Sequence, residues 1–211
     1  MQSIILITLA YLLGSISTAL VVSKVGYGID IREHGSGNAG ATNTFRVLGQ
    51  KAGIIVMIGD ILKGVIAVQL ALLQSNFPQG QDSFVNFEVL LGIASVVGHV
   101  FPIWSDFRGG KGIATLFGMV LSIQPSAALL LIVVFVTMLI ITQYVSLSSI
   151  SASIAFPIII LFIYREPEIM YRIFAVSAAL VVVLTHHKNI NRLMHGNESK
   201  MNLFKRKSKD L

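Results

Sequence analysis

Long apolar stretches dominate this chain, and they leave little room for any fold other than membrane-spanning helices. Seven such segments follow one another, at residues 4–23, 53–73, 86–104, 113–123, 127–142, 148–164 and 173–185. A helix needs about 20 apolar residues to cross the hydrocarbon core of a bilayer, and most of these segments reach or approach that length. We therefore expect an all-α, polytopic integral membrane protein with about seven transmembrane helices.

The composition agrees with a membrane protein and excludes other classes. Charged residues make up 12% of the chain, whereas a soluble domain carries about 25%. The net charge of +6 would fit a nucleic-acid partner. The basic residues are confined to short segments between the apolar runs, however, as in cytoplasmic loops of membrane proteins, so we expect no nucleic-acid partner. The chain has no cysteine, which excludes disulfides and a thiolate nucleophile.

The distribution of basic residues predicts the topology. Thirteen of the sixteen lysines and arginines lie in 24–52, 105–112 and 186–211. Segment 113–123 would cover only roughly 17 Å as a helix, but counting it as a separate crossing places all three basic regions on one side. The N-terminus is then outside and the C-terminus cytoplasmic. No basic residue precedes the apolar start, so it does not resemble a signal peptide. We expect one membrane domain at 1–198 and a basic cytoplasmic tail at 199–211.

The first polar cluster runs from His34 to Asn43 and is followed by Arg46. Its glycines match the dinucleotide-binding pattern G-x-G-x-x-G by letter, but membrane spans flank it instead of a βαβ unit. Glycines let backbone amides approach a ligand closely, and helix N-termini favour anions. The cluster therefore predicts a phosphate site built from Ser36, Gly37, Asn38, Thr42, Asn43 and Arg46. A tight turn with helix caps is the alternative.

The second cluster runs from Gly98 to Thr115 and contains a glycine-rich loop. The loop is not a Walker A loop, because Ser105 replaces its first glycine and Gly112 replaces the residue that would bind magnesium. It opens a new helical segment and offers amides and an ammonium group, which suits a phosphate or an oxyanion. The candidate residues are Gly109, Gly110, Lys111 and Gly112. A basic turn between helices is the alternative, and His99 alone is more typical of an interface histidine.

The third cluster begins at Thr185 and ends beyond Leu193, with Glu198 further on. The adjacent histidines at 186 and 187 lack the spacing of a metal site, so we expect no metal. If the segment is helical, His186 and Asn189 share one face at the membrane surface.

Two smaller polar features lie within or beside the apolar segments. Asp60 and Lys63 are three residues apart and share one helix face; ionisable groups inside a span are usually paired or functional, and mutual pairing is the simpler interpretation. Ser146 and Ser149 belong to a short polar break after segment 127–142. Serines also pack helices in membranes, which is the alternative explanation for both.

In order and spacing, the runs 35–43, 98–115 and 186–198 resemble the three motifs of the bacterial acyl-phosphate:glycerol-3-phosphate acyltransferase family, PlsY. The similarity extends to Asp60, Lys63 and the Tyr144–Leu147 segment, and it covers nearly the whole chain except the tail. The resemblance implies a seven-helix bacterial inner-membrane enzyme that works at the cytoplasmic side. Such an enzyme transfers a fatty acyl group from acyl phosphate to the 1-hydroxyl of sn-glycerol 3-phosphate and forms lysophosphatidic acid. It needs no cofactor and is functionally linked to the enzyme that makes acyl phosphate.

The resemblance also implies roles by position. Ser36 and Arg46 match residues for glycerol-phosphate binding and catalysis, and Lys111 with its neighbouring glycines matches the loop that holds acyl phosphate. His186 and Asn189 match functional positions of the third motif. The remaining matches are Glu198, tied to structural integrity, and Ser146 and Ser149, which look like active-site serines. Two departures, Ala39 and Ser17, stand where many members have proline, and they concern local rigidity only.

The predicted mechanism holds two anionic substrates close together. Arg46 and Lys111 neutralise the two phosphates, and proximity supplies much of the rate. The base is either His186 or the phosphate of the substrate. The alternative function is a membrane transporter for an organic phosphate, which would need a polar path through several spans. A scaffold protein would leave the three polar clusters unexplained.

Overall fold

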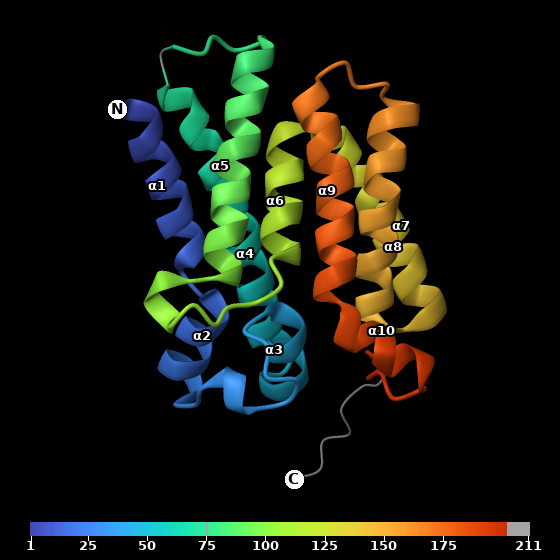
Figure 1. Ribbon diagram of the computed structural model, residues 1–211. Coiled ribbons are helices and arrows are strands. Elements are labelled where there is room, and N and C mark those ends of the chain that lie inside the picture. Colours follow the sequence, from blue (N-terminus) through green and yellow to red (C-terminus); the bar gives the residue numbers. More distant parts are fainter. Residues whose placement is uncertain (75, 202–211) are drawn as a thin grey trace.

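Helices make up the regular structure of this computed structural model, which describes residues 1–74 and 76–201. No strand occurs in those residues, and the helices stand side by side in an upright bundle (Figure 1). The longer helices are α1 (Gln2–Ser15), α2 (Thr18–Tyr27), α3 (Ala41–Leu48), α4 (Gln50–Gln69), α5 (Asp82–Val100), α6 (Ile113–Ile123), α7 (Pro125–Thr142), α8 (Val145–Ile158), α9 (Ile169–Thr185) and α10 (His187–Met194). The short ones are η1 (Ile31–Glu33), η2 (Leu70–Leu73), η3 (Ile103–Ser105) and the π-type turn η4 (Ile159–Ile163).

The helices have the length and composition of membrane spans. Within residues 1–74 and 76–201, four helical stretches are long and apolar enough to cross a membrane, and two bent pairs, α1 with α2 and α9 with α10, raise the number to six. The shorter α6 has 11 residues. The all-α membrane class predicted from the sequence is confirmed, whereas the count of seven stays a prediction. Residues 202–211 of the predicted tail lie outside the described part of the chain.

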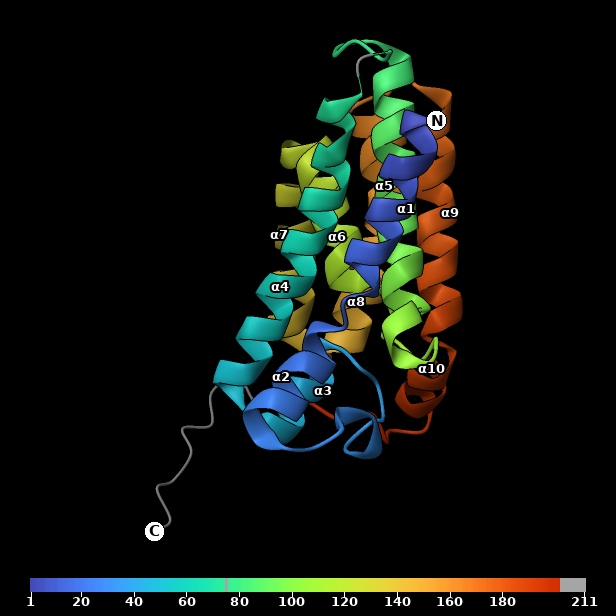
Figure 2. The same ribbon diagram turned by 90° about the vertical axis from the view of Figure 1, so that its left-hand side faces the viewer.

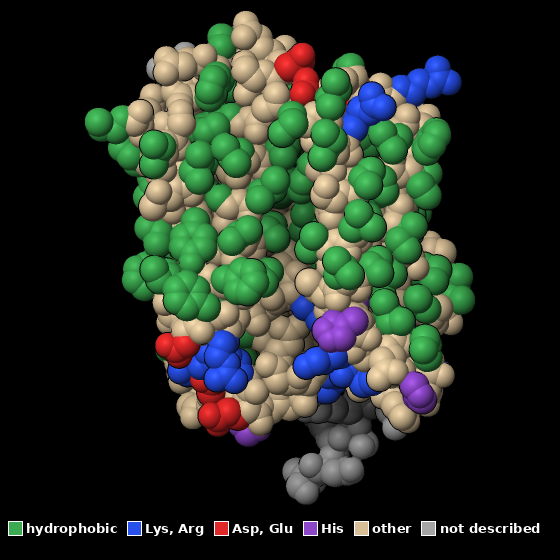
Figure 3. Space-filling view, viewed as in Figure 1, with side chains coloured by type: hydrophobic (Ala, Val, Ile, Leu, Met, Phe, Trp, Pro, Cys, Tyr) green, Lys and Arg blue, Asp and Glu red, His purple; other side chains and the backbone are tan. Residues whose placement is uncertain are grey.

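The two ends of the bundle differ in chemistry. Apolar side chains cover the middle of the face shown in Figure 3; lysine, arginine and histidine side chains gather near its lower end, and fewer charged side chains, of both signs, lie at its upper end. The short helices α2, α3 and α10 lie at that end in both ribbon views, while the N-terminus lies at the other (Figures 1 and 2). The segments that carry the three polar clusters therefore share one end of the molecule.

The first expected span, 4–23, is broken into two helices. Ile16 and Ser17 have extended backbones, with ψ angles of 104° and 93°, and α2 bends by 41° from α1. The Lys63 ammonium donates a hydrogen bond to the Ile16 carbonyl at 3.0 Å, and the Thr18 hydroxyl donates to the Asp60 carboxylate at 2.9 Å. Lys63 of α4 thus satisfies a backbone carbonyl at the break, as hydrocarbon surroundings require, and Asp60 holds the first residue of α2 by its side chain.

Glycines allow the close packing of α4 on α6. A Cβ atom on Gly64 would lie 2.3 Å from the Thr115 carbonyl oxygen, and one on Gly118 would lie 2.1 Å from the Ile61 carbonyl oxygen. These backbones approach each other because no side chain separates them, which is a common way for membrane helices to associate.

The other half of the bundle packs around aromatic side chains. Phe156 of α8 meets Tyr171 and Phe174 of α9, with ring centroids 6.2 and 5.8 Å away. Pro157 follows Phe156, and the helix then widens into η4, where the Tyr164 amide donates to the Ile159 carbonyl at 2.9 Å. A proline inside a helix commonly causes such a change, because it cannot donate a backbone hydrogen bond.

The glycine packing predicts a loss of stability on adding one methyl group. Gly118→Ala should lower the free energy of unfolding by about 1–3 kcal/mol, because the new Cβ would overlap the α4 backbone. Thermal unfolding in detergent measures the effect. Gly26→Ala is the control, since nothing lies within 4 Å of its Cβ position. Equal stability of the two variants would contradict the packing argument.

Candidate active site

The side chain of Asn43 organises the first polar loop. Its carbonyl oxygen accepts from the Ser36 amide at 2.8 Å, and its amide group donates to the carbonyls of Ile31 and His34 at 3.1 and 2.9 Å. Gly35 has a φ of 63°, and a Cβ there would lie 2.3 Å from the Asn43 carbonyl oxygen. Asn43 is buried, so its amide shapes the loop from inside.

The loop presents its other predicted residues outward. Ser36, Gly37, Thr42 and Arg46 are exposed, and Asn38 is half-buried. The Gly37 amide donates to the His34 carbonyl at 3.1 Å. Among the described residues, Arg46 forms no ion pair, so the first loop offers a hydroxyl and an uncompensated guanidinium to solvent.

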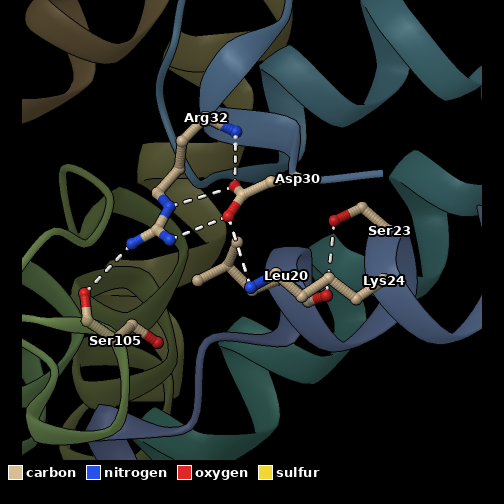
Figure 4. A network of polar contacts seen from close by, with 6 residues as sticks. All are labelled: Leu20, Ser23, Lys24, Asp30, Arg32 and Ser105. Carbon is tan, nitrogen blue, oxygen red and sulfur yellow. Dashed lines mark hydrogen bonds and ion pairs between the residues drawn. The ribbon is translucent and has the colours of Figure 1, made fainter. Parts of the chain in front are cut away.

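An ion pair ties this region to the second loop (Figure 4). Arg32 donates to both carboxylate oxygens of Asp30, at 3.0 and 2.8 Å, and also to the Ser105 carbonyl at 3.1 Å. Lys24 lies 3.3 Å from the same carboxylate. The Arg32 hydrogen bonds hold the pKa of Asp30 far below its ordinary value. The segment after α2 is thereby fixed against η3.

The second loop uses two of its glycine amides internally. The Gly109 amide donates to the Val100 carbonyl and the Gly110 amide donates to the His99 carbonyl, both at 3.2 Å. These two amides therefore fold the loop against the end of α5 instead of facing a ligand. The donors that remain nearby are the Lys111 ammonium and the first turn of α6, which starts directly after Gly112.

One carboxylate gathers the third cluster. Glu198 accepts hydrogen bonds from Ser146 of α8 and Asn189 of α10, both at 2.7 Å, and from Arg192 of α10 at 2.6 Å. The Asn189 side-chain oxygen in turn accepts a hydrogen bond from the Lys111 ammonium. The structure therefore joins three predicted site residues, Lys111, Ser146 and Asn189, in one network that crosses from the second loop to α8 and α10.

Within residues 1–74 and 76–201, the Lys111 ammonium has no direct carboxylate partner. Lys111 contacts the neutral amide of Asn189, while Glu198 is bound to Arg192. Burial, aided by the charge of Arg192, lowers the pKa of Lys111 to about 8, and Glu198 only partly opposes the shift. A half-buried ammonium of this kind is stabilised by an anion that contacts it.

His186 lies in the bend between α9 and α10, where the helices turn by 58°. It is therefore a cap residue and not part of the helix that carries Asn189. Its Nδ1 lies 2.7 Å from the Val182 carbonyl and donates to it, which leaves Nε2 as a hydrogen-bond acceptor. Burial and then the Lys111 charge lower its pKa to about 4, so the imidazole is neutral near pH 7.

One residue of the network, Arg192, was not among the predicted site residues. Arg192 lies three positions after Asn189, a spacing that puts both on one helix face and could have indicated that Arg192 belongs to the site.

The predicted site residue Ser149 does not join the network. It lies one helical turn from Ser146 and donates to the Val145 carbonyl at 2.9 Å instead. Residues 1–74 and 76–201 contain no group of three or more His, Asp or Glu side chains arranged to hold a metal ion.

The Glu198 contacts predict a pH-dependent contribution to stability. Burial alone would raise the pKa of this carboxyl, but the hydrogen bonds from Arg192, Asn189 and Ser146 outweigh it and lower the pKa from 4.5. A lowered pKa in the folded state means that the stabilisation is present above pH 4.5 and is lost as the pH falls through the folded-state value.

The matched variant is Glu198→Gln, which keeps the size of the side chain without its charge. We expect wild type to unfold at a higher temperature than the variant at pH 7, with the difference shrinking steadily below pH 4.5. Thermal unfolding in detergent across this pH range measures it. A difference that does not change with pH would show that the carboxylate charge has no part.

Comparisons with known proteins agree with this architecture. The family described as glycerol-3-phosphate acyltransferase matches residues 4–196. A glycerol-3-phosphate acyltransferase of Bacillus cytotoxicus is 48% identical over 96% of both chains, and one of Geobacillus kaustophilus is 44% identical over 93% of this chain and 95% of its own.

Solved structures give the same result. A crystal structure of PlsY (YgiH), an integral membrane glycerol 3-phosphate acyltransferase in its glycerol 3-phosphate form, is 35% identical, with a TM-score of 0.86 over 95% of this chain and 96% of that one. Its lysophosphatidic acid form has a TM-score of 0.83 over the same shares. Sequence and structure together show that the chain belongs to the PlsY family of integral membrane glycerol-3-phosphate acyltransferases.

Proposed function

We propose that this protein transfers a fatty acyl group from acyl phosphate to the 1-hydroxyl of sn-glycerol 3-phosphate, releasing lysophosphatidic acid and phosphate. The observation that carries the proposal is the Lys111 ammonium, which is held by the neutral Asn189 side chain and contacts no carboxylate in the described part of the chain. This arrangement suits an anionic, already activated donor. The related crystal structures, in glycerol 3-phosphate and lysophosphatidic acid forms, support the acceptor and the product.

The two cations divide the two phosphates between them. Lys111, beside α8 and α10, binds the phosphate of the donor, and Arg46 with Ser36 binds the phosphate of glycerol 3-phosphate at the first loop. Phosphate is a good leaving group, so the acyl transfer needs no covalent enzyme intermediate. Positioning of the two substrates then supplies most of the rate enhancement.

The acceptor hydroxyl attacks the carbonyl carbon of the donor, the bond to the phosphate oxygen breaks, and phosphate leaves with that electron pair. A proton must leave the attacking hydroxyl. His186 is a weak base, because its pKa is about 4, so a substrate phosphate is the better proton acceptor. The neutral imidazole instead offers Nε2 as a hydrogen-bond acceptor that orients the hydroxyl.

We propose the cytoplasmic face of the bacterial inner membrane as the place of the reaction. The N-terminus and α10 lie at opposite ends of the bundle, which supports an odd number of crossings, seven if α6 counts as one (Figure 1). The three basic regions, 24–52, 105–112 and 186–211, predict that the end with the site faces the cytoplasm. There the protein would receive its donor from the enzyme that makes acyl phosphate.

The donor assignment predicts a selective assay. Purified protein in lipid should form lysophosphatidic acid from palmitoyl phosphate and labelled glycerol 3-phosphate, and none from palmitoyl-CoA. Lys111→Ala should lose at least about 100-fold in kcat/KM, the scale expected when an electrostatic contact to the reacting group is removed. Product from palmitoyl-CoA alone would contradict the proposal. Folded protein inactive with both donors would favour phosphate transport, tested as flux in liposomes.

The pKa of Lys111 predicts how donor affinity depends on pH. The group is protonated below its pKa of about 8 and loses its charge above it, so the KM for acyl phosphate should rise as the pH increases beyond 8. Lys111→Arg keeps its charge throughout, because arginine does not deprotonate in this range. Initial rates from pH 6 to 9.5 measure both proteins. The same alkaline rise in the arginine variant would assign it to another group.

A further inference from the structure

Another group of polar side chains, separate from the Lys111 network, is buried inside the bundle. The Asp60 carboxylate accepts from Thr18 and Lys63, both at 2.9 Å, and the same oxygen lies 3.6 Å from His99 Nδ1. Thr115 is hydrogen-bonded to that ring nitrogen at 3.2 Å. We call these five side chains the Asp60 cluster. They come from α2, α4, α5 and α6. An exposed fraction of at most 6% is found for Asp60, Lys63, His99 and Thr115.

At one side the Asp60 cluster holds the break between α1 and α2. Lys63 lies against the Ile16 carbonyl at the end of α1, and Asp60 lies against Thr18 at the start of α2. A cation at a helix C-terminus and an anion at a helix N-terminus each complement the local helix dipole. The cluster therefore fixes where α2 begins, and α2 leads directly into the first polar loop.

At the other side the cluster supports the second loop. A Cβ atom on Gly110 would lie 2.3 Å from His99 Nε2 and 2.7 Å from the Ala39 carbonyl oxygen. Gly110 is thus packed between the imidazole and the first polar loop. Since Gly110 directly precedes Lys111, the position of the His99 ring bears on the position of that ammonium group.

Chains of contacts therefore connect both polar loops to one buried carboxylate, that of Asp60. The path to the first loop runs from Asp60 through Thr18 and α2, and the path to the second runs through His99 to Gly110. An ion pair in an apolar interior is weak evidence of stability, because an apolar pair of similar volume often stabilises as well or better. The placement of this pair between the two loops suggests a use other than stability.

We propose that Asp60 is a positioning residue for acyl transfer, which sets the first polar loop against the loop that carries Lys111. The inference rests on the proposed function but goes beyond it, since Asp60 is buried and lies outside both polar loops. Binding of each substrate depends on its own loop, whereas reaction depends on the distance between them. Loss of the cluster should therefore reduce kcat much more than it changes either KM.

The main test variant combines Asp60→Leu with Lys63→Met, so that no buried charge is left unpaired. We expect kcat to fall at least about tenfold, because small displacements of reacting groups have effects of this size or larger. The KM values for both substrates should change little. Thr18→Val and Thr115→Val each remove one hydroxyl from the cluster with both charges retained, and smaller losses of kcat are expected. These single variants decide the question if the double variant does not fold.

The matched control is Thr8→Val. Thr8 also lies in the broken first span, and its hydroxyl donates to the Ile4 carbonyl of its own helix at 2.9 Å instead of joining the Asp60 cluster. It should keep wild-type kcat. Full activity in Thr18→Val, Thr115→Val and the folded double variant would overturn the proposal and leave the cluster a purely structural element.

A second readout separates this inference from the proposed reaction. The chain has no cysteine, so cysteines introduced in place of the exposed His34 and Arg108 can carry spin labels on the two loops without further changes. The double variant should shift or broaden the distance distribution between these labels, and the Thr8→Val control should not. An unchanged distribution overturns the positioning role even if the reaction is as proposed. A changed distribution supports it even if the donor assignment fails.

Discussion

Polar groups inside a bilayer must find their partners within the protein, and this requirement shapes the whole molecule. In the hydrocarbon core no water is present to satisfy a carbonyl that leaves a helix. The break after α1 exposes such a group at Ile16, and Lys63 donates to it while Asp60 keeps the ammonium paired. Where the helices have no breaks, glycines bring them close enough for backbone contact, as between α4 and α6.

The choice of partners also determines the electrostatics of the site at the end of the bundle. Glu198 accepts from three donors, and its charge is directed at Arg192. Asn189 stands between this carboxylate and Lys111, so the ammonium has a neutral partner. An aspartate in place of Asn189 would neutralise the charge needed for an anionic substrate. The amide thus positions the lysine and leaves its charge available.

The sequence predicted the general architecture well, because its strongest signals were local. Helix α6 has the bounds expected from the apolar run 113–123, and the three polar clusters lie at one end of the bundle, as the basic residues indicated. The break at Ile16 and Ser17 was not predicted, although small and polar residues interrupt the apolar run at 14–18, because the side chains that stabilise it lie in α4.

The hydrogen bonds of the loop amides could not be predicted from the sequence either. Glycines at 109 and 110 suggested free donors for a phosphate, but their amides bind carbonyls at the end of α5. Asn43, expected beside a ligand, holds its own loop together. A residue type that can bind a ligand can equally bind the chain itself. Only the three-dimensional arrangement distinguishes the two, because the competing partners are distant or lie in irregular backbone.

The place of Glu198 in the chain has a consequence for the order in which contacts can form. Its three donors all precede it, Ser146 by 52 residues and Asn189 by nine. During synthesis these donors therefore leave the ribosome before their shared acceptor does. Until the carboxylate follows, it cannot hold Asn189 in place as the partner of Lys111, so the network is closed by the last of its residues to be made.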